Sequence, residues 1–403
     1  MVKKNNLKES KEIKMQTHFL NETTVRTSVN YGINNIKVEF DLPDENKQKT
    51  FENFSISTDE IDKMNIKISD EGNEKEFSSK IGLSFKKYKK IVIDIPDNTE
   101  IKNTVLLDFL FNEDNNYLVD NIKINIGKNA KANFIIHYYS DNFILSESQD
   151  KIKNENINFH NLLLETNIGD NGESNIICAN LLNDDANSFL AFENILNENS
   201  RLAHTIVDLG GKNKISNYNS KLVGNCSFNN IKNVYLGAKK DIIDINYNIE
   251  AIGKSTKCII ESQGALIDSA KKNFKGIIDF KEGSTKSIGK ENENCLILSD
   301  KARSRSLPVL LCHEEDVNGE HGVSSGKPDK QKMFYIMSKG ISYSDARKLL
   351  VKANFNNILY GIENESLNTE INDKIDEKIN EKINEKINEK INETNEKINE
   401  KNN

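Results

Sequence analysis

The sequence predicts a mainly β protein, in which a long stack of short strands is followed by a pair of helices. Short apolar segments recur between turn residues from about residue 103 to residue 312. No helical 3.6-residue pattern interrupts these segments, so a sheet of alternating helices and strands is not expected. After Pro308 the pattern changes, and apolar residues begin to recur at helical spacing.

Residues 1–100 form the first predicted unit, a small N-terminal β-rich region. Its first dozen or so residues are polar and are expected to be disordered. Apolar and polar residues then alternate over Ile36–Leu42 and Lys90–Ile95, and each run ends at a proline. Alternation with a period of two predicts strands.

Residues 101–315 form the predicted β core. Short strands separated by residues such as Gly169–Gly172 and Gly210–Asn213 fit a sandwich, a barrel or a solenoid. Some two hundred residues are many for one sandwich but natural for a stack of coils. The spacing of the strands therefore favours a β-helix, although no strict motif recurs.

Residues 316–365 are predicted to form a C-terminal two-helix domain. Pro328 and Asp329 are typical of a first helical turn, and Gly340 can end that helix. Ser342 and Asp345 have capping-box spacing, and an amphipathic stripe follows.

Residues 366–403 form a low-complexity tail that repeats Lys-Ile-Asn-Glu. Its isoleucines recur every four residues, so on a helix they drift round the axis and keep no coiled-coil seam. We therefore expect the tail to be a solvated helix or disordered, and to be dispensable.

Composition excludes several classes of function. The net charge of −7, without a basic patch, argues against nucleic-acid binding. A polar, basic start and the lack of a long apolar stretch predict a cytoplasmic protein without a signal peptide or membrane span. The five cysteines are widely spaced without a CxxC pair, so neither a disulfide framework nor a self-contained metal site is predicted. There is also no phosphate-binding loop, dinucleotide fingerprint, nucleophile elbow or HExxH motif.

Residues 294–350 read NCLILSDKARSRSLPVLLCHEEDVNGEHGVSSGKPDKQKMFYIMSKGISYSDARKLL. This stretch resembles the SufB/SufD family of iron–sulfur cluster assembly proteins in the order and spacing of its motifs. The matching positions are Leu296–Ser299, Pro308, Glu315–Val317, His321–Gly322, Gly326, Phe334–Tyr335, Ser338, Gly340–Ile341, Ala346–Arg347 and Leu349–Leu350. His321-Gly322-Val323 is closer to the His-Gly-Ala of SufD than to the His-Glu-Ala of SufB, so a SufD-like member is favoured.

The resemblance implies a right-handed parallel β-helix with a C-terminal helical domain. It also implies a non-enzymatic scaffold that pairs with a SufB-like paralogue and docks the SufC-type ABC ATPase, with a cysteine desulfurase system acting indirectly. The cofactor expected is a transient iron–sulfur cluster at the subunit interface, and flavin is a further candidate in the complex.

The resemblance makes His321 the candidate ligand for iron or for the cluster, since a neutral imidazole binds iron. On the residues alone, a hydrogen-bonded histidine in a turn before the helix is the alternative. Many SufD proteins carry a cysteine two residues before this histidine, where this chain has Gly319. Glu320 is a weaker candidate ligand, and Cys312 and His313 are weaker still.

The candidate SufC-docking surface consists of Phe334, Tyr335, Lys339, Ile341, Arg347 and Leu349. Its apolar members fit equally well as packing between the two helices. Three other functions remain open: a SufB-like scaffold acting as a homodimer with SufC, a carbohydrate-active β-helix, and a generic solenoid for protein binding.

Overall fold

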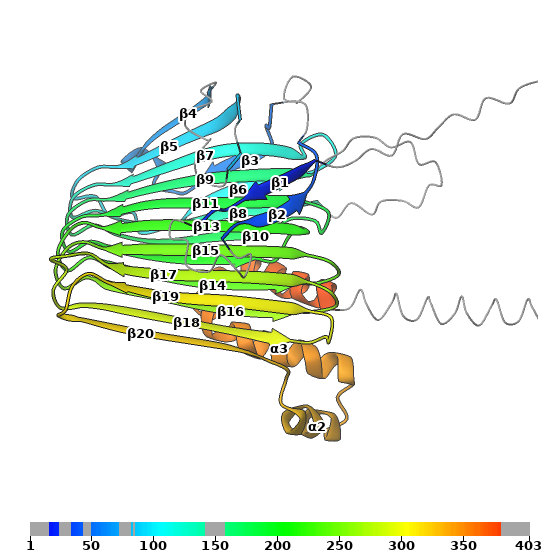
Figure 1. The fold of residues 1–403 in the computed structure, drawn as a ribbon. Coiled ribbons are helices and arrows are strands. Elements are labelled where there is room, and N and C mark those ends of the chain that lie inside the picture. Colours follow the sequence, from blue (N-terminus) through cyan, green and yellow to red (C-terminus); the bar gives the residue numbers. More distant parts are fainter. Residues whose placement is uncertain are drawn as a thin grey trace, which may run out of the picture.

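The computed structural model describes residues 16–23, 34–42, 50–71, 82–83, 85–141 and 158–379. These residues form a β-solenoid of about eight turns with three helices in its C-terminal region (Figure 1). The predicted fold class is therefore confirmed. No helix among the residues described is long and apolar enough to span a membrane.

From β5 onward the strands alternate along the chain between two sheets, and each sheet has nine described strands. The first sheet contains β3 (Phe54–Ser57), β6 (Val105–Phe111), β8 (Lys131–Ser140), β10 (Glu173–Leu181), β12 (Arg201–Asp208), β14 (Phe228–Gly237), β16 (Lys257–Leu266), β18 (Ser287–Ile297) and β20 (Val317–Gly326). The second contains β4 (Asn65–Glu71), β5 (Tyr88–Ile95), β7 (Tyr117–Ile126), β9 (Phe159–Ile168), β11 (Asn187–Leu196), β13 (Asn213–Leu222), β15 (Ile242–Ala251), β17 (Lys271–Phe280) and β19 (Arg303–Cys312).

Successive coils stack as parallel strands in register. In β16 and β18, for example, Ile260 lies beside Glu291 and Gly264 beside Cys295. Side chains alternate between the two faces of a strand, so one row of each strand fills the space between the sheets. That row is mostly apolar and forms the main core, which extends from Phe51 to Ala302.

The coils repeat regularly although no strict sequence motif recurs. Asparagines at equivalent turns account for much of this regularity. Asn98, Asn129, Asn171 and Asn199 occupy equivalent turns, each with φ between 52° and 56°. Asparagine tolerates this left-handed conformation better than most residues. The side-chain amides of the last three also donate to the asparagine of the preceding turn, at 2.9–3.0 Å, so the turns are linked from coil to coil.

The solenoid is longer at both ends than the predicted core of residues 101–315. At the N-terminal end β5 already pairs in parallel with β7, and the antiparallel strands β3 and β4 cap the two sheets. A 3-10 turn, η3 (Ile61–Lys63), connects β3 to β4. At the C-terminal end β20 extends the first sheet to Gly326. The parallel stack thus includes β5 and β20, on either side of most of residues 101–315.

The hairpin of β1 (Thr17–Leu20) and β2 (Ile36–Glu39) packs on the outer face of the second sheet. It is anchored by Asn21, which is fully buried and has a φ of 57°. The Asn21 amide donates to the Asp244 carboxylate at 2.7 Å, and Lys275 pairs with the same carboxylate. The predicted disorder of the first residues falls on residues outside the described part.

The two predicted helices are confirmed as α2 (Lys330–Ser338) and α3 (Tyr343–Leu359). Asp329 caps α2 by accepting from the Gln331 amide, and Ser342 caps α3 by accepting from the Asp345 amide. Gly340, with a φ of 87°, turns the chain between them.

The expectation of a solvated tail is wrong for its first part. Residues 365–379 form a third helix, in which Ile371, Ile375 and Ile379 are buried against an apolar stripe on the outer face of the first sheet. Lys378 is buried between Asp184 and Asp241, at 3.0 and 3.4 Å. Over so few turns, the four-residue isoleucine step still keeps one face toward the sheet. Residues 380–403 lie outside the described part.

We expect Ile375→Ala to lower the free energy of unfolding by about 2–4 kcal/mol, because it leaves a cavity between this helix and the sheet. Glu377→Ala, on the exposed side of the same turn, is the matched control and should change it by less than about 0.5 kcal/mol. Chemical denaturation measures both. Equal stability of the two variants would contradict the observed docking of this helix.

Candidate functional site

The last coil of the solenoid leaves two strand edges without a partner among the described residues. β20 pairs with β18 on one side, and β19 pairs with β17 on one side; these strands end the two sheets. In Figure 1 both lie at the end of the stack from which α2 projects. Among the described residues, no further coil covers the inward-facing side chains of β19 and β20. These side chains are therefore open to a partner.

His321 belongs to that inward row. Its Cα partner is Glu291 of β18, which is fully buried in the solenoid interior. Because partners in register share one face of the sheet, His321 lies over the interior, and it is exposed only since the stack ends there. It therefore lies in a strand, and the alternative of a turn before the helix is wrong.

The other sequence-predicted ligands do not join His321. Glu320 lies on the opposite face of β20, where it pairs with Lys290 at 3.0 Å. His313 approaches the Asp279 carboxylate at 3.6 Å. Cys312 is exposed at the far end of β19, in register with Phe280.

Gly319, two residues before His321, lies against apolar side chains of the last two coils. A Cβ atom placed on Gly319 would lie 3.0 Å from the Leu310 side chain of β19 and 3.4 Å from Phe280. Leu310 packs against the main core at this end of the stack. A cysteine side chain at position 319 would therefore have to displace the Leu310 side chain.

Beneath the inward row of the last coil lies a group of buried polar residues that satisfy one another's charge and hydrogen bonds. The Glu293 carboxylate contacts the Lys272 ammonium, accepts from Tyr235 Oη at 2.7 Å and accepts from Ser306 Oγ at 2.6 Å. Both charged side chains are fully buried. Glu293 thus has a partner for its charge and several hydrogen bonds, as a buried ion pair requires.

Glu291 lies two residues away and lacks such partners. It is fully buried, and neither carboxylate oxygen has a hydrogen-bond partner. Burial, and to a lesser degree the neighbouring Glu293 carboxylate, raises the pKa of Glu291 to about 8. A group of this kind is costly to bury and is often part of a functional site.

Gly276 of β17 provides the space that Glu291 occupies. A Cβ atom placed on Gly276 would lie only 2.0 Å from Glu291 Oε1. The carboxylate therefore extends across the interior to the backbone of the facing strand. One coil further along, Pro308 and His321 lie beside Gly276 and Glu291 respectively.

Metal-binding capacity within this chain is limited. No group of three or more His, Cys, Asp or Glu side chains in the described ranges is arranged to hold a metal ion. His321 and Glu291 are two groups only, so a metal at this end of the solenoid would need ligands in addition to these two side chains.

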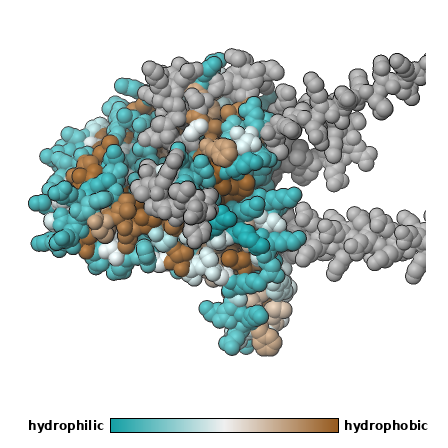
Figure 2. Space-filling model, viewed as in Figure 1, coloured by the Kyte–Doolittle hydropathy of each residue, from teal (hydrophilic) through white to brown (hydrophobic). Residues whose placement is uncertain are grey.

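The predicted docking residues form an exposed surface on α2 and α3. The exposed fraction is 76% for Phe334, 63% for Tyr335 and 47% for Leu349, so these side chains do not hold the two helices together. Figure 2 shows this helical part projecting from the solenoid, with apolar side chains among polar ones at its tip. Lys339 lies over the Tyr335 ring, at 5.3 Å from its centroid.

Arg347 and Ile341 are less accessible. Arg347 is half-buried over the Tyr343 ring and donates to the Leu298 carbonyl at 3.4 Å, which fixes α3 to the end of β18. Ile341 is partly buried between the helices. A groove of about 610 Å³ separates α2 from the end of β18, with Met333, Phe334 and Arg347 in its lining.

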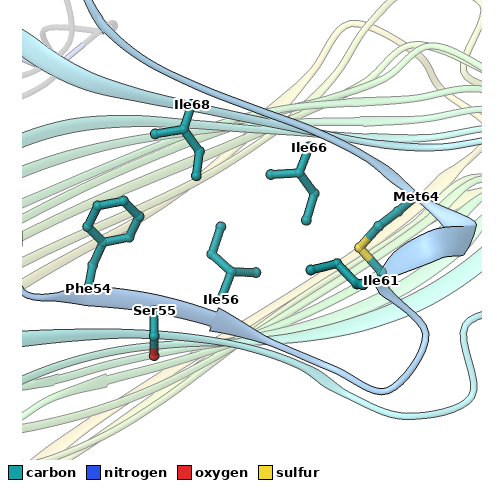
Figure 3. Close-up of a pocket in the computed structure, with 7 residues that line it drawn as sticks. All are labelled: Phe54, Ser55, Ile56, Ile61, Met64, Ile66 and Ile68. Carbon is teal, nitrogen blue, oxygen red and sulfur yellow. The ribbon is translucent and has the colours of Figure 1, made fainter.

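A second cavity, of about 510 Å³, lies at the N-terminal end of the solenoid (Figure 3). Ile56 and Phe54 of β3 face Ile66 and Ile68 of β4 across it, whereas Ser55 points away. Its lining lacks the convergent polar groups that orient a ligand. It therefore defines no chemical site.

An arrangement of Ser188, His160 and Asp120 in the interior resembles the groups used for nucleophilic catalysis. The His160 nitrogens lie 3.4 Å from Ser188 Oγ and 3.3 Å from Asp120 Oδ1. His160 and Asp120 are fully buried, and Tyr138 donates to Asp120 at 2.6 Å. No substrate in solution can reach these groups, so they serve packing.

The sequence interpretation missed Glu291, Glu293 and Lys272. The available signal was the alternation Glu-Asn-Glu-Asn-Cys over residues 291–295, which places two carboxylates on the same face as Cys295. That alternation is equally typical of a solvated strand face. Only the position of β18 within the stack shows that the face is the interior.

Together, the solenoid, its open edge with an inward histidine and its exposed helical arm define the chain as a β-solenoid protein with a helical C-terminal part. A family model described as the SufBD core domain of SUF-system FeS cluster assembly matches residues 109–354, more than half of the chain. The chain therefore belongs to the SufB/SufD family, and the first relatives below support a SufD-like member.

Relatives in three bacteria bear this out. A segment of 137 residues, 34% of this chain, is 31% identical to the iron–sulfur cluster assembly protein SufD of Bacillus subtilis and covers 31% of it. The SufD protein of Escherichia coli is 24% identical over 199 residues, 45% of each protein. A SufBD family protein of Synechocystis is 23% identical over 286 residues, 68% of this chain and 60% of the relative. The chain spans about a third of the length of the first relatives it matches.

We expect Gly276→Ala to destabilise the protein by about 1–3 kcal/mol, because the added methyl group overlaps the Glu291 carboxylate. In a Glu291→Ala background the same change should cost much less. A double-mutant cycle by chemical denaturation measures the coupling. Additive effects would show that Glu291 does not occupy the space over Gly276.

Proposed function

We propose that this chain is a non-catalytic scaffold subunit of an iron–sulfur cluster assembly complex. It pairs with a SufB-like paralogue through the open end of its solenoid and docks a SufC-type ATPase on its helical arm. The nascent cluster forms at the paired interface, beside His321. The observation that carries this proposal is the position of His321, on the inward row of an edge strand that ends the stack.

The free edges of β19 and β20 support pairing with another solenoid. An edge strand presents unpaired backbone groups that template a further strand. Protective edges commonly carry lysine or proline; β20 has neither over its ten residues, whereas β19 has one proline, Pro308. A homologous solenoid offers strands of matching length, and would cover the inward row of the last coil.

The helical arm supports a separate partner. Phe334, Tyr335 and Leu349 are exposed, and exposed aromatic anchors are typical of interface hot spots. The chain has no nucleotide-binding motif of its own, so ATP-driven movement has to be supplied by that partner. A second copy of this chain could occupy the open end instead, which corresponds to the homodimeric alternative.

We expect His321→Ala to leave assembly of the complex intact but to lower its iron and sulfide content several-fold. The imidazole is exposed and contributes a ligand without holding strands together. The measurement is anaerobic coexpression with the SufB-like and SufC-like proteins of the same genome, followed by purification and metal analysis. His313→Ala, a second exposed histidine outside the site, is the matched control.

An unchanged iron and sulfide content in His321→Ala would remove His321 as a ligand and retain the scaffold role. Absence of any complex with the wild-type chain would overturn the proposed function. Recovery of this chain with SufC alone, as a dimer of two copies, would favour the homodimeric alternative.

We expect Leu349→Asp to weaken binding of the SufC-like ATPase at least ten-fold, because a charge replaces an exposed apolar contact. Tyr360→Asp is the matched control, since Tyr360 is 86% exposed but lies beyond the end of α3. Calorimetric titration of each purified chain with the ATPase measures both. Equal binding by the two variants would place the docking surface elsewhere.

A further inference from the structure

The open end of the solenoid contains a second polar group on the same inward face as His321. Glu291 is the Cα partner of His321 and shares its inward face. Side chains at such positions start from backbones about 4.8 Å apart. A metal ion with bonds of about 2 Å to each side chain can bridge that separation.

The surroundings of Glu291 distinguish it from the other buried groups nearby. Glu293 is neutralised by Lys272 and bonded to Tyr235 and Ser306. Glu291 has neither a cation nor a hydrogen bond at its two oxygens, although it is fully buried. A cation at His321 would provide the missing partner.

Flexibility allows the carboxylate to change its direction. In the structure it extends toward Gly276, where the missing Cβ leaves room for it. A glutamate has three rotatable bonds, so its carboxylate can swing from Gly276 toward His321 without a change in the backbone. The neighbouring inward residues of β20, Gly319 and Val323, offer no competing donor.

We propose that Glu291 and His321 form a mixed carboxylate–imidazole site for a divalent iron ion at the open end of the solenoid. The proposal rests on the proposed role of His321 and adds Glu291 as the second ligand from this chain. Oxygen and nitrogen donors of this kind suit ferrous iron. The carboxylate takes the place of the cysteine that position 319 lacks, but reaches the metal from the preceding coil.

Glu320 cannot supply this carboxylate, because it projects from the outer face of β20 and pairs with Lys290. The Cys295 side chain also faces inward, but it is in register with Ser325, four residues along β20 from His321. Glu291 is therefore the inward carboxylate nearest to His321 in the register of the last two coils.

The experiment is an anaerobic calorimetric titration of the full chain with Co²⁺, a stable substitute for ferrous iron. Other surface groups also bind Co²⁺ weakly, so the relevant binding is the component that His321→Ala abolishes. We expect one such ion per chain, and at least a ten-fold loss of affinity in Glu291→Gln. Glu320→Gln, which removes a carboxylate from the adjacent residue on the opposite face, should retain the wild-type affinity.

Glu291→Met keeps the length of the side chain without its oxygens, and is the second variant if Glu291→Gln does not fold. It should show the same loss. Wild-type affinity in either folded variant would overturn the role of Glu291 while leaving His321 as a ligand. Absence of any His321-dependent component would overturn the metal site of this chain, whereas the coexpression experiment tests the scaffold role independently.

Discussion

Every coil of this protein depends on the coil stacked beside it. The inward row of one strand is buried only because the next coil places its own inward row over it, in register. The energetic gain is the removal of apolar surface from water, and no single coil can obtain it alone. This constraint fixes the parallel register. It also means that the inward rows at the two ends of the stack are not buried by a further coil.

The two ends meet this constraint differently. At the N-terminal end the antiparallel strands β3 and β4 cap the sheets with isoleucine, phenylalanine and methionine side chains. At the C-terminal end the inward row of β20 carries Val317, Gly319, His321, Val323 and Ser325. The groups below it include the Glu293–Lys272 ion pair and Glu291, whose carboxyl oxygens have no hydrogen-bond partner. The N-terminal cap is therefore mainly apolar, whereas the C-terminal end combines apolar with polar groups, and the site that we propose lies there.

The sequence predicted the class of fold and the two capped helices, and each has a local cause. Alternation marks strands, and Asp329 and Ser342 mark helix starts through their own side chains. What the sequence could not show depends on neighbours distant along the chain. Glu291 and Glu320 are both charged residues in alternating segments, yet one is fully buried and the other pairs at the surface. Likewise, Ile375 belongs to a repeat that is indistinguishable from a solvated helix until the apolar stripe of the first sheet is known.

Gly319 shows a further effect of a neighbour that is distant along the chain. At that position a side chain would meet Leu310, which packs on the core of the last coil. The glycine therefore leaves room for the Leu310 side chain. Glu291 belongs to the preceding coil and lies in register with His321. In the metal site that we propose, Glu291 belongs to a coil that is already stacked, and it stays out of water until a partner covers the end.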